Sequence, residues 1–194
     1  MIHIINITYV SDIRKTYAEI TTLSYLITIL YLIVTTIAQI TDPSKDDFLW
    51  KFQRLMHVFS FSAEATVVVF YWAILAEDNI SNYDTTCESP EWCLFNTFIT
   101  HGVVAIPAWT ALIFQFTLVR CMDVFWSLGC ACVLLFGVNM PVSLFYEQIY
   151  DPISYKDIQS YVYIGGGLVL NATGFFLGYV ISLIRTRQVR SSVL

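Results

Sequence analysis

One uncharged and strongly apolar run of 26 residues, Leu94 to Val119, constrains this chain more than any other feature. A helix needs about 20 such residues to cross a bilayer, so this run predicts a membrane-spanning helix. The whole chain has 57% hydrophobic and only 13% charged residues. This composition is typical of an integral membrane protein and not of a soluble domain.

Five apolar runs of the chain are long enough to span a membrane. They cover about residues 19–40, 57–76, 94–119, 124–146 and 161–183. We therefore expect an all-α fold, an integral membrane bundle of five transmembrane helices, with residues 1–194 forming a single membrane domain. The net charge of −5 argues against nucleic acid as a partner.

The Lys and Arg residues outside these runs predict the orientation of the bundle. Seven of them fall on the side that carries the C-terminus and three on the other side. Cytosolic segments carry the excess of Lys and Arg, so the C-terminus is predicted to be cytosolic. We expect a multi-pass protein of the endoplasmic reticulum or another endomembrane.

The loop of residues 77–93 then lies on the non-cytosolic side. It contains five acidic residues, no Lys or Arg, and two cysteines, Cys87 and Cys93. In an oxidising compartment these thiols can form a disulfide, and two free thiols are the alternative. Asn6 and Asn79, on the same side, match the glycosylation pattern.

Polar residues within the runs are the candidates for chemistry. His101 lies about 10 Å below the outer surface by helix geometry, in a run without charges. An ionisable side chain at that depth is a functional-site hypothesis. The hydroxyls of Ser24 and Thr28, in the first run, bracket the same level, and Glu64 of the second run lies near the middle of the bilayer.

These residue types suggest a hydrolytic site. A Ser or Thr hydroxyl attacks a carbonyl carbon well only when an adjacent base takes its proton. Ser24 or Thr28 is then the nucleophile, His101 the base, and Glu64 a supporting group. The structural alternative is that the hydroxyls bond to their own helix or join two helices, and that the imidazole and the carboxyl are neutral and bonded to neighbours.

We expect neither a metal nor a cofactor, because the three histidines lie at different levels. His3 precedes the first run, His57 lies at the cytosolic end of the second, and His101 lies near the outer end of the third. They cannot ligate one zinc ion or one haem. The chain also lacks a Walker nucleotide-binding loop.

The last run has one face of small residues with a GxxxG spacing: Gly167, Asn171, Gly174 and Gly178. Such a face lets another helix approach closely. We interpret it first as a contact within the chain and second as the interface of a homodimer. Pro107 and Pro141, in the third and fourth runs, are expected to bend their helices and leave room for a ligand or water.

Several stretches of the chain follow the order of motifs in a known family. They are Leu23-Ser24 followed by Ile40-Thr41-Asp42, Phe70-Tyr71-Trp72 with Asp78, Ile149-Tyr150 with Pro152, and Asn171 with Leu177-Gly178-Tyr179-Val180. In this order and spacing the chain resembles the androgen-induced family of multipass membrane proteins. The resemblance covers about residues 23–184.

Members of that family are described as threonine hydrolases that use a Thr and a His to cleave fatty acid esters of hydroxy fatty acids. The resemblance implies that Ser24 takes the place of the Thr. It implies that the His falls in Thr100-His101-Gly102, where the family has Asn-His-x-x-His-Thr before a proline and a one-residue gap aligns the second histidine. We therefore expect an intramembrane hydrolase whose lipid substrate enters from the bilayer. The alternative is a non-catalytic membrane scaffold or lipid-binding protein.

Overall fold

The computed structural model describes residues 20–41, 48–81, 89–103, 105–114, 119–145 and 153–193. Five helical stretches in it are long and apolar enough to cross a membrane: Thr21–Ile40, Phe48–Ile74, Pro90–Phe114, Asp123–Phe145 and Ile158–Arg187. The described part of the chain has no strand. The predicted all-α bundle of five transmembrane helices is confirmed, and the protein is a multipass membrane protein.

Three of the five spans contain a π-helical segment, labelled η, between α-helical parts. The first span is α3 (Ile20–Thr41) and the last is α11 (Ile158–Val193). The second consists of α4 (Phe48–Phe70), η1 (Tyr71–Leu75) and α5 (Ala76–Ser81). The third consists of α7 (Pro90–Phe98), η2 (Ile99–Val103) and α8 (Ala105–Phe114). The fourth consists of α9 (Asp123–Cys132), η3 (Val133–Asn139) and α10 (Met140–Phe145).

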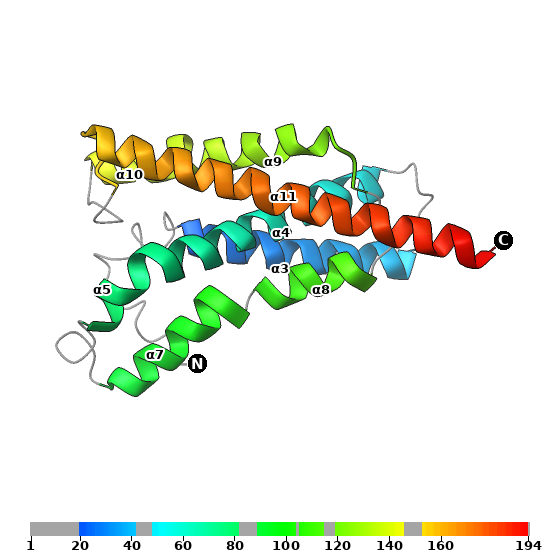
Figure 1. Ribbon diagram of the computed structural model, residues 1–194, viewed down its shortest axis with the longest axis horizontal. Helices are drawn as coiled ribbons and strands as arrows, with labels where there is room; N and C mark the ends of the chain where they lie inside the picture. The colour runs from blue at the N-terminus through cyan, green and yellow to red at the C-terminus, as the bar shows by residue number, and fades with distance from the viewer. Residues whose placement is uncertain are drawn as a thin grey trace.

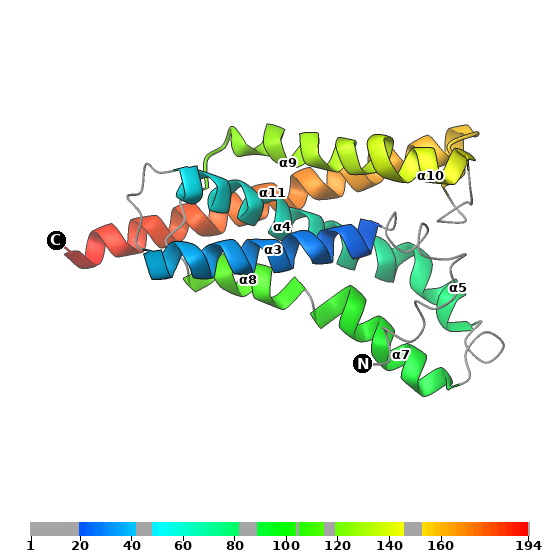
Figure 2. The ribbon, with the colours of Figure 1, turned by 180° about the vertical axis from the view of Figure 1, so that it is seen from behind.

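Helix α4 is the central element of the bundle and contacts α3, α8, α9 and α11. Figures 1 and 2 show α9 and α10 running along α11 on one side of the molecule, with α3 and α8 beside α4 on the other. A buried apolar cluster joins four of these helices through residues that include Phe61, Leu112, Val124 and Phe175. Because α8, α9 and α11 each bury side chains of this cluster against α4, the cluster determines which helices are neighbours of α4.

The second helix begins at Phe48, well before the predicted residue 57. Lys51 and Arg54 made this segment look like part of a loop, but both are good helix formers. Arg54 lies 3.5 Å from Asp123 at the start of α9, and this ion pair ties the N-terminal parts of α4 and α9 together.

The glycine face of α11 is an intrachain contact. A Cβ atom on Gly174 would lie 2.9 Å from the Cβ of Ala65, and one on Gly178 would collide with the ring of Phe61. Nothing lies within 4 Å of a Cβ placed on Gly167. Because α4 covers Gly174 and Gly178, a homodimer through α11 would need another face of that helix. The homodimer stays a prediction.

Both prolines follow a π-helical segment closely. Pro107 comes after η2 and Pro141 after η3, and the wider turn of a π-helix leaves room for a proline ring. In the third span the expected bend is visible, because α7 points away from the axis of α8 (Figure 2). The fourth span continues from α9 to α10 without a comparable change of direction (Figure 2).

The last helix begins with a side-chain cap. Asp157 accepts hydrogen bonds from the backbone N–H of Ser160 at 2.7 Å and from the Ser160 hydroxyl at 2.9 Å. Hydrogen bonds from Ser154 and Ser160 hold the pKa of Asp157 below its ordinary value. Nearby, the Tyr155 hydroxyl donates to Asn139 Oδ1 at 2.6 Å, which ties this loop to η3.

The packing of Gly178 predicts a specific loss of stability. We expect Gly178→Ala to lower the free energy of unfolding by about 1–3 kcal/mol, because Phe61 is fully buried and cannot move aside. Gly166→Ala is the matched control, since nothing lies within 4 Å of its added methyl group. Unfolding by SDS in mixed micelles, followed by circular dichroism, measures both. Equal midpoints for the two variants would contradict this account of the interface.

Candidate functional site

Four buried polar side chains meet where α3 packs on α4, and we call them the hydroxyl–carboxyl cluster: Ser24, Thr28, Ser60 and Glu64. The Thr28 hydroxyl donates to Glu64 Oε1 at 3.0 Å and lies 2.7 Å from the Ser60 hydroxyl. A hydroxyl has one proton, so Ser60 is the donor in that second bond. Ser24 donates to the carbonyl oxygen of Thr21 at 3.0 Å and also interacts with the Glu64 carboxyl.

Helical spacing explains why these residues meet. Ser24 and Thr28 are four residues apart on α3, as are Ser60 and Glu64 on α4, so each pair lies on one helix face. Consecutive spans run in opposite directions through the membrane. Ser24 therefore lies on the side of the cluster that faces the C-terminal end of α4, where Tyr71 begins η1.

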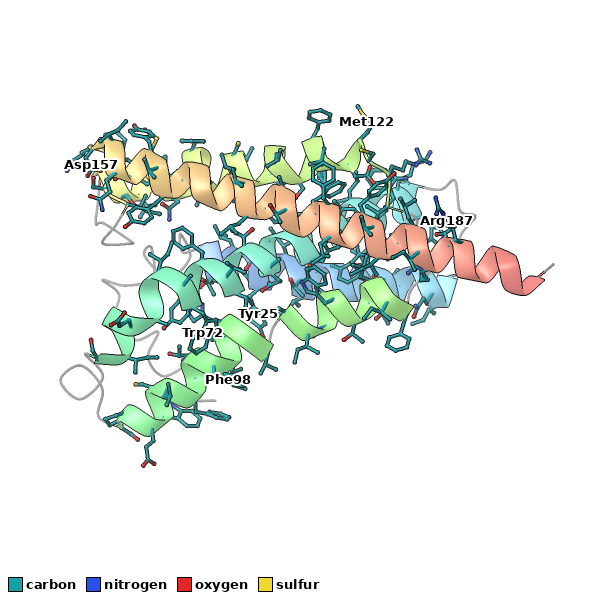
Figure 3. The ribbon with its side chains drawn as sticks, in the orientation of Figure 1. Tyr25, Trp72, Phe98, Met122, Asp157 and Arg187 are labelled. Carbon is teal, nitrogen blue, oxygen red and sulfur yellow. The ribbon has the colours of Figure 1, made fainter. Side chains whose placement is uncertain are left out.

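His101 lies in η2 and is held by two residues of η1. Its imidazole stacks on the Tyr71 ring, with centroids 3.6 Å apart and an angle of 3° between the planes. Trp72 donates from Nε1 to the backbone carbonyl oxygen of His101 at 3.1 Å. We call Tyr71, Trp72 and His101 the histidine clamp. Figure 3 shows Trp72 close to Phe98 of α7, whose ring it meets edge-on at 6.5 Å.

The structure brings three of the four predicted site residues together and leaves the fourth nearby. Ser24, Thr28 and Glu64 belong to the hydroxyl–carboxyl cluster, whereas the His101 ring forms no hydrogen bond with any of them. The buried Nδ1 of His101 has no hydrogen-bond partner in the described part of the chain. The pairing of a hydroxyl with His101 stays a prediction.

The second span nevertheless contributes to both arrangements: Glu64 belongs to the hydroxyl–carboxyl cluster and Tyr71 to the histidine clamp. Glu64 and Tyr71 are seven residues apart, which is about two turns, and they share one face of the second span. The stacked imidazole is thus roughly 10 Å along the axis from the level of the carboxyl. Ser24 lies between these levels, whereas Thr28 lies beyond Glu64 on the far side.

Sequence reasoning missed Ser60, Tyr71 and Trp72. Ser60 precedes Glu64 by four residues and Tyr71 follows it by seven, so the spacing of one helix face was a signal for both. No helical spacing indicated Trp72, because its partner, the His101 carbonyl oxygen, belongs to another span.

A second polar network joins α4 to α9 and α11. The Ser62 and Ser127 hydroxyls lie 2.5 Å apart, and Ser127 donates to Asn171 Oδ1 at 2.8 Å. Asn171, predicted to lie on the glycine face, thus contributes a polar contact to it. We interpret this network as structural, because it consists of neutral groups bonded to one another.

His57 has a structural environment as well. Its fully buried ring stacks on Tyr31 with centroids 4.7 Å apart, and Nε2 donates to the carbonyl oxygen of Ala108 at 3.2 Å. The described residues contain no group of three His, Cys, Asp or Glu side chains that could hold a metal ion. His3 lies outside the described residues.

Cys93 is disulfide-bonded, and its predicted partner Cys87 lies outside the described residues. Asn6 also lies outside them, and Asn79 is part of α5. On the opposite side of the bundle, Cys121 is an exposed free thiol.

Comparison with protein-family models, with curated proteins and with solved structures found no match to this chain. The resemblance to the androgen-induced family therefore stays a prediction.

The hydroxyl–carboxyl cluster predicts how much Thr28 contributes to stability. Thr28→Val keeps the shape but removes the bonds to Ser60 and Glu64, so we expect the free energy of unfolding to fall by about 1–2 kcal/mol. The control is Thr36→Val on the same helix, where the hydroxyl is exposed and bonds only to the Leu32 carbonyl. SDS unfolding measures both, and an equal effect of the two variants would show that the cluster adds nothing.

Proposed function

We propose that this protein is an intramembrane hydrolase of lipid esters such as fatty acid esters of hydroxy fatty acids. The observation that carries the proposal is the hydroxyl–carboxyl cluster, in which Glu64 interacts with Ser24 and Thr28 inside the first two spans. Ionisable groups at that depth are costly and usually functional. The resemblance to the androgen-induced family supports the same reaction class.

Ser24 is the better nucleophile of the two. The Thr28 proton is engaged by Glu64 and its oxygen accepts from Ser60, whereas Ser24 lies on the side of the cluster nearer to His101. The Ser24 hydroxyl donates to the carbonyl oxygen of Thr21 and is close enough to Glu64 to interact with its carboxyl. The Nδ1 atom of His101, without a partner, is available as the proton acceptor in the tautomer that carries its proton on Nε2.

The reaction then runs in two steps. Ser24 Oγ forms a bond with the ester carbonyl carbon while His101 takes its proton, and His101 returns that proton to the departing hydroxyl of the hydroxy fatty acid. In the second step His101 takes a proton from water, the water oxygen bonds to the acyl carbon, and the fatty acid leaves as Ser24 recovers its proton. The scheme requires the imidazole and Ser24 to approach each other when substrate binds, as catalytic pairs often do.

A non-catalytic scaffold or lipid-binding protein is the second candidate. The observation that favours it is that Thr28, Ser60 and Glu64 already bond to one another, as polar side chains between membrane helices do without any catalytic role.

An assay with the purified full-length protein in nanodiscs separates the two functions. With a fatty acid ester of a hydroxy fatty acid as substrate, we expect Ser24→Ala and His101→Ala to lower kcat/KM by about 100-fold or more, because each removes a reacting group. Ser24→Thr should keep activity, since it keeps a hydroxyl, and Thr36→Ala is the control. A fluorophosphonate probe should label the wild type and not Ser24→Ala. Equal turnover in wild type, Ser24→Ala and His101→Ala would end the assignment.

We further propose that the C-terminus is cytosolic and that the protein resides in the endoplasmic reticulum or another endomembrane. The distribution of Lys and Arg supports this orientation. So do the cysteines, because a disulfide at Cys93 suits an oxidising lumen and an exposed thiol at Cys121 suits a reducing cytosol.

The orientation is tested by labelling Cys121 in sealed microsomes. We expect a membrane-impermeant maleimide to label the protein without detergent, and Cys121→Ser to remove most of that labelling. Labelling of Cys121 that appears only after the membrane is opened would reverse the orientation.

A further inference from the structure

The histidine clamp joins two irregular turns of different spans. Tyr71 is the first residue of η1 and His101 is the central residue of η2, so two π-helical segments face each other. Such segments are rare and occur frequently at functional sites. Pro107 lies shortly after η2 and accounts for its wider turn, but η1 contains neither proline nor glycine. The local sequence therefore gives no reason for η1.

A reason appears in what η1 does to the residues around it. One extra residue in a helical turn rotates all following residues by about 100° relative to the preceding ones. Tyr71 stays on the face that carries Ser60 and Glu64, while Trp72 bonds to the His101 carbonyl oxygen. The ring plane of His101 and the backbone of η2 are thus fixed from the same turn.

We propose that Tyr71 and Trp72 are positioning residues that set the plane and the depth of the His101 imidazole relative to the hydroxyl–carboxyl cluster. This inference rests on the proposed hydrolase function. Tyr71 acts through ring stacking and Trp72 through its hydrogen bond to the backbone. Tyr71 contacts His101 at the face of the imidazole and Trp72 contacts it at the backbone, so both act through His101. Since α4 and η1 are continuous, one helical element carries both the Glu64 carboxyl, which interacts with Ser24, and the Tyr71 ring, which stacks on His101.

The first test is independent of catalysis and uses NMR of histidine-labelled protein in nanodiscs. The stacked Tyr71 ring should shift the ring-proton signals of His101, which are assigned by their loss in His101→Gln. We expect Tyr71→Phe to keep this shift and Tyr71→Leu to remove it. The signal of His57, stacked on Tyr31, is the internal reference and should not move. An unchanged His101 signal in folded Tyr71→Leu would overturn the proposal.

The second test compares two equivalent tryptophans. Trp72 and Trp126 are both 38% exposed and both donate from Nε1 to a backbone carbonyl oxygen at 3.1 Å, that of His101 and of Leu55 respectively. We expect Trp72→Phe and Tyr71→Leu to lower kcat by about 10- to 100-fold with KM nearly unchanged, as a misplaced base does. Trp126→Phe should stay near the wild type, and Tyr71→Phe, which keeps the stacked ring, should retain more of the wild-type kcat than Tyr71→Leu.

The outcomes separate this inference from the function on which it rests. Wild-type turnover that persists in Tyr71→Leu and Trp72→Phe would overturn the positioning role and leave the hydrolase standing. Absence of turnover in the wild type would overturn the hydrolase, and the positioning role with it. A fall in kcat together with loss of the His101 shift would support both.

Discussion

Polar side chains inside a lipid bilayer have no water to bond to, and the arrangement of this bundle follows from where they find partners. Most of these partners involve α4. Glu64 meets the hydroxyls of α3, Ser62 meets polar groups of α9 and α11, and His57 meets a carbonyl of α8. An unsatisfied polar group in hydrocarbon costs several kcal/mol, so each bond selects the helix that faces it. Hydrogen bonding as well as apolar packing therefore determines the central position of α4.

The apolar contacts determine how closely the helices approach. Gly174 and Gly178 bring α11 against Ala65 and Phe61, and Phe61 in turn packs near Trp109 of α8. Close approach of backbones is what allows short side chains such as serine to reach across an interface. The Ser62 network thus depends on the glycines, although no glycine takes part in it.

The fold could be predicted because the length of an apolar run measures the membrane directly. The first and fourth spans end within a residue or two of their predicted limits. The second does not, because Lys51 and Arg54 lower the local hydropathy, whereas the backbone hydrogen bonds of the helix continue through them to Phe48. The bend in the third span followed from Pro107, whereas η3 accommodates Pro141 without a similar bend.

The sequence singled out the polar residues of the candidate site but predicted that Ser24 and Thr28 bracket the level of His101, whereas both lie on the Glu64 side of it. A rise of about 1.5 Å per residue gives the level of each side chain, and Thr28, Ser24 and Glu64 do meet. Which neighbour a residue faces also depends on rotation about the helix axis and on the order of helices around α4, and tertiary packing decides both. Glu64 was expected either to support the imidazole or to bond to a neighbour, and it bonds to Thr28. The histidine clamp could not be predicted from sequence patterns. Trp72 reaches the His101 carbonyl oxygen because η1 changes the helical pitch, and the residues of η1, Tyr71 to Leu75, contain no proline or glycine that would indicate such a change.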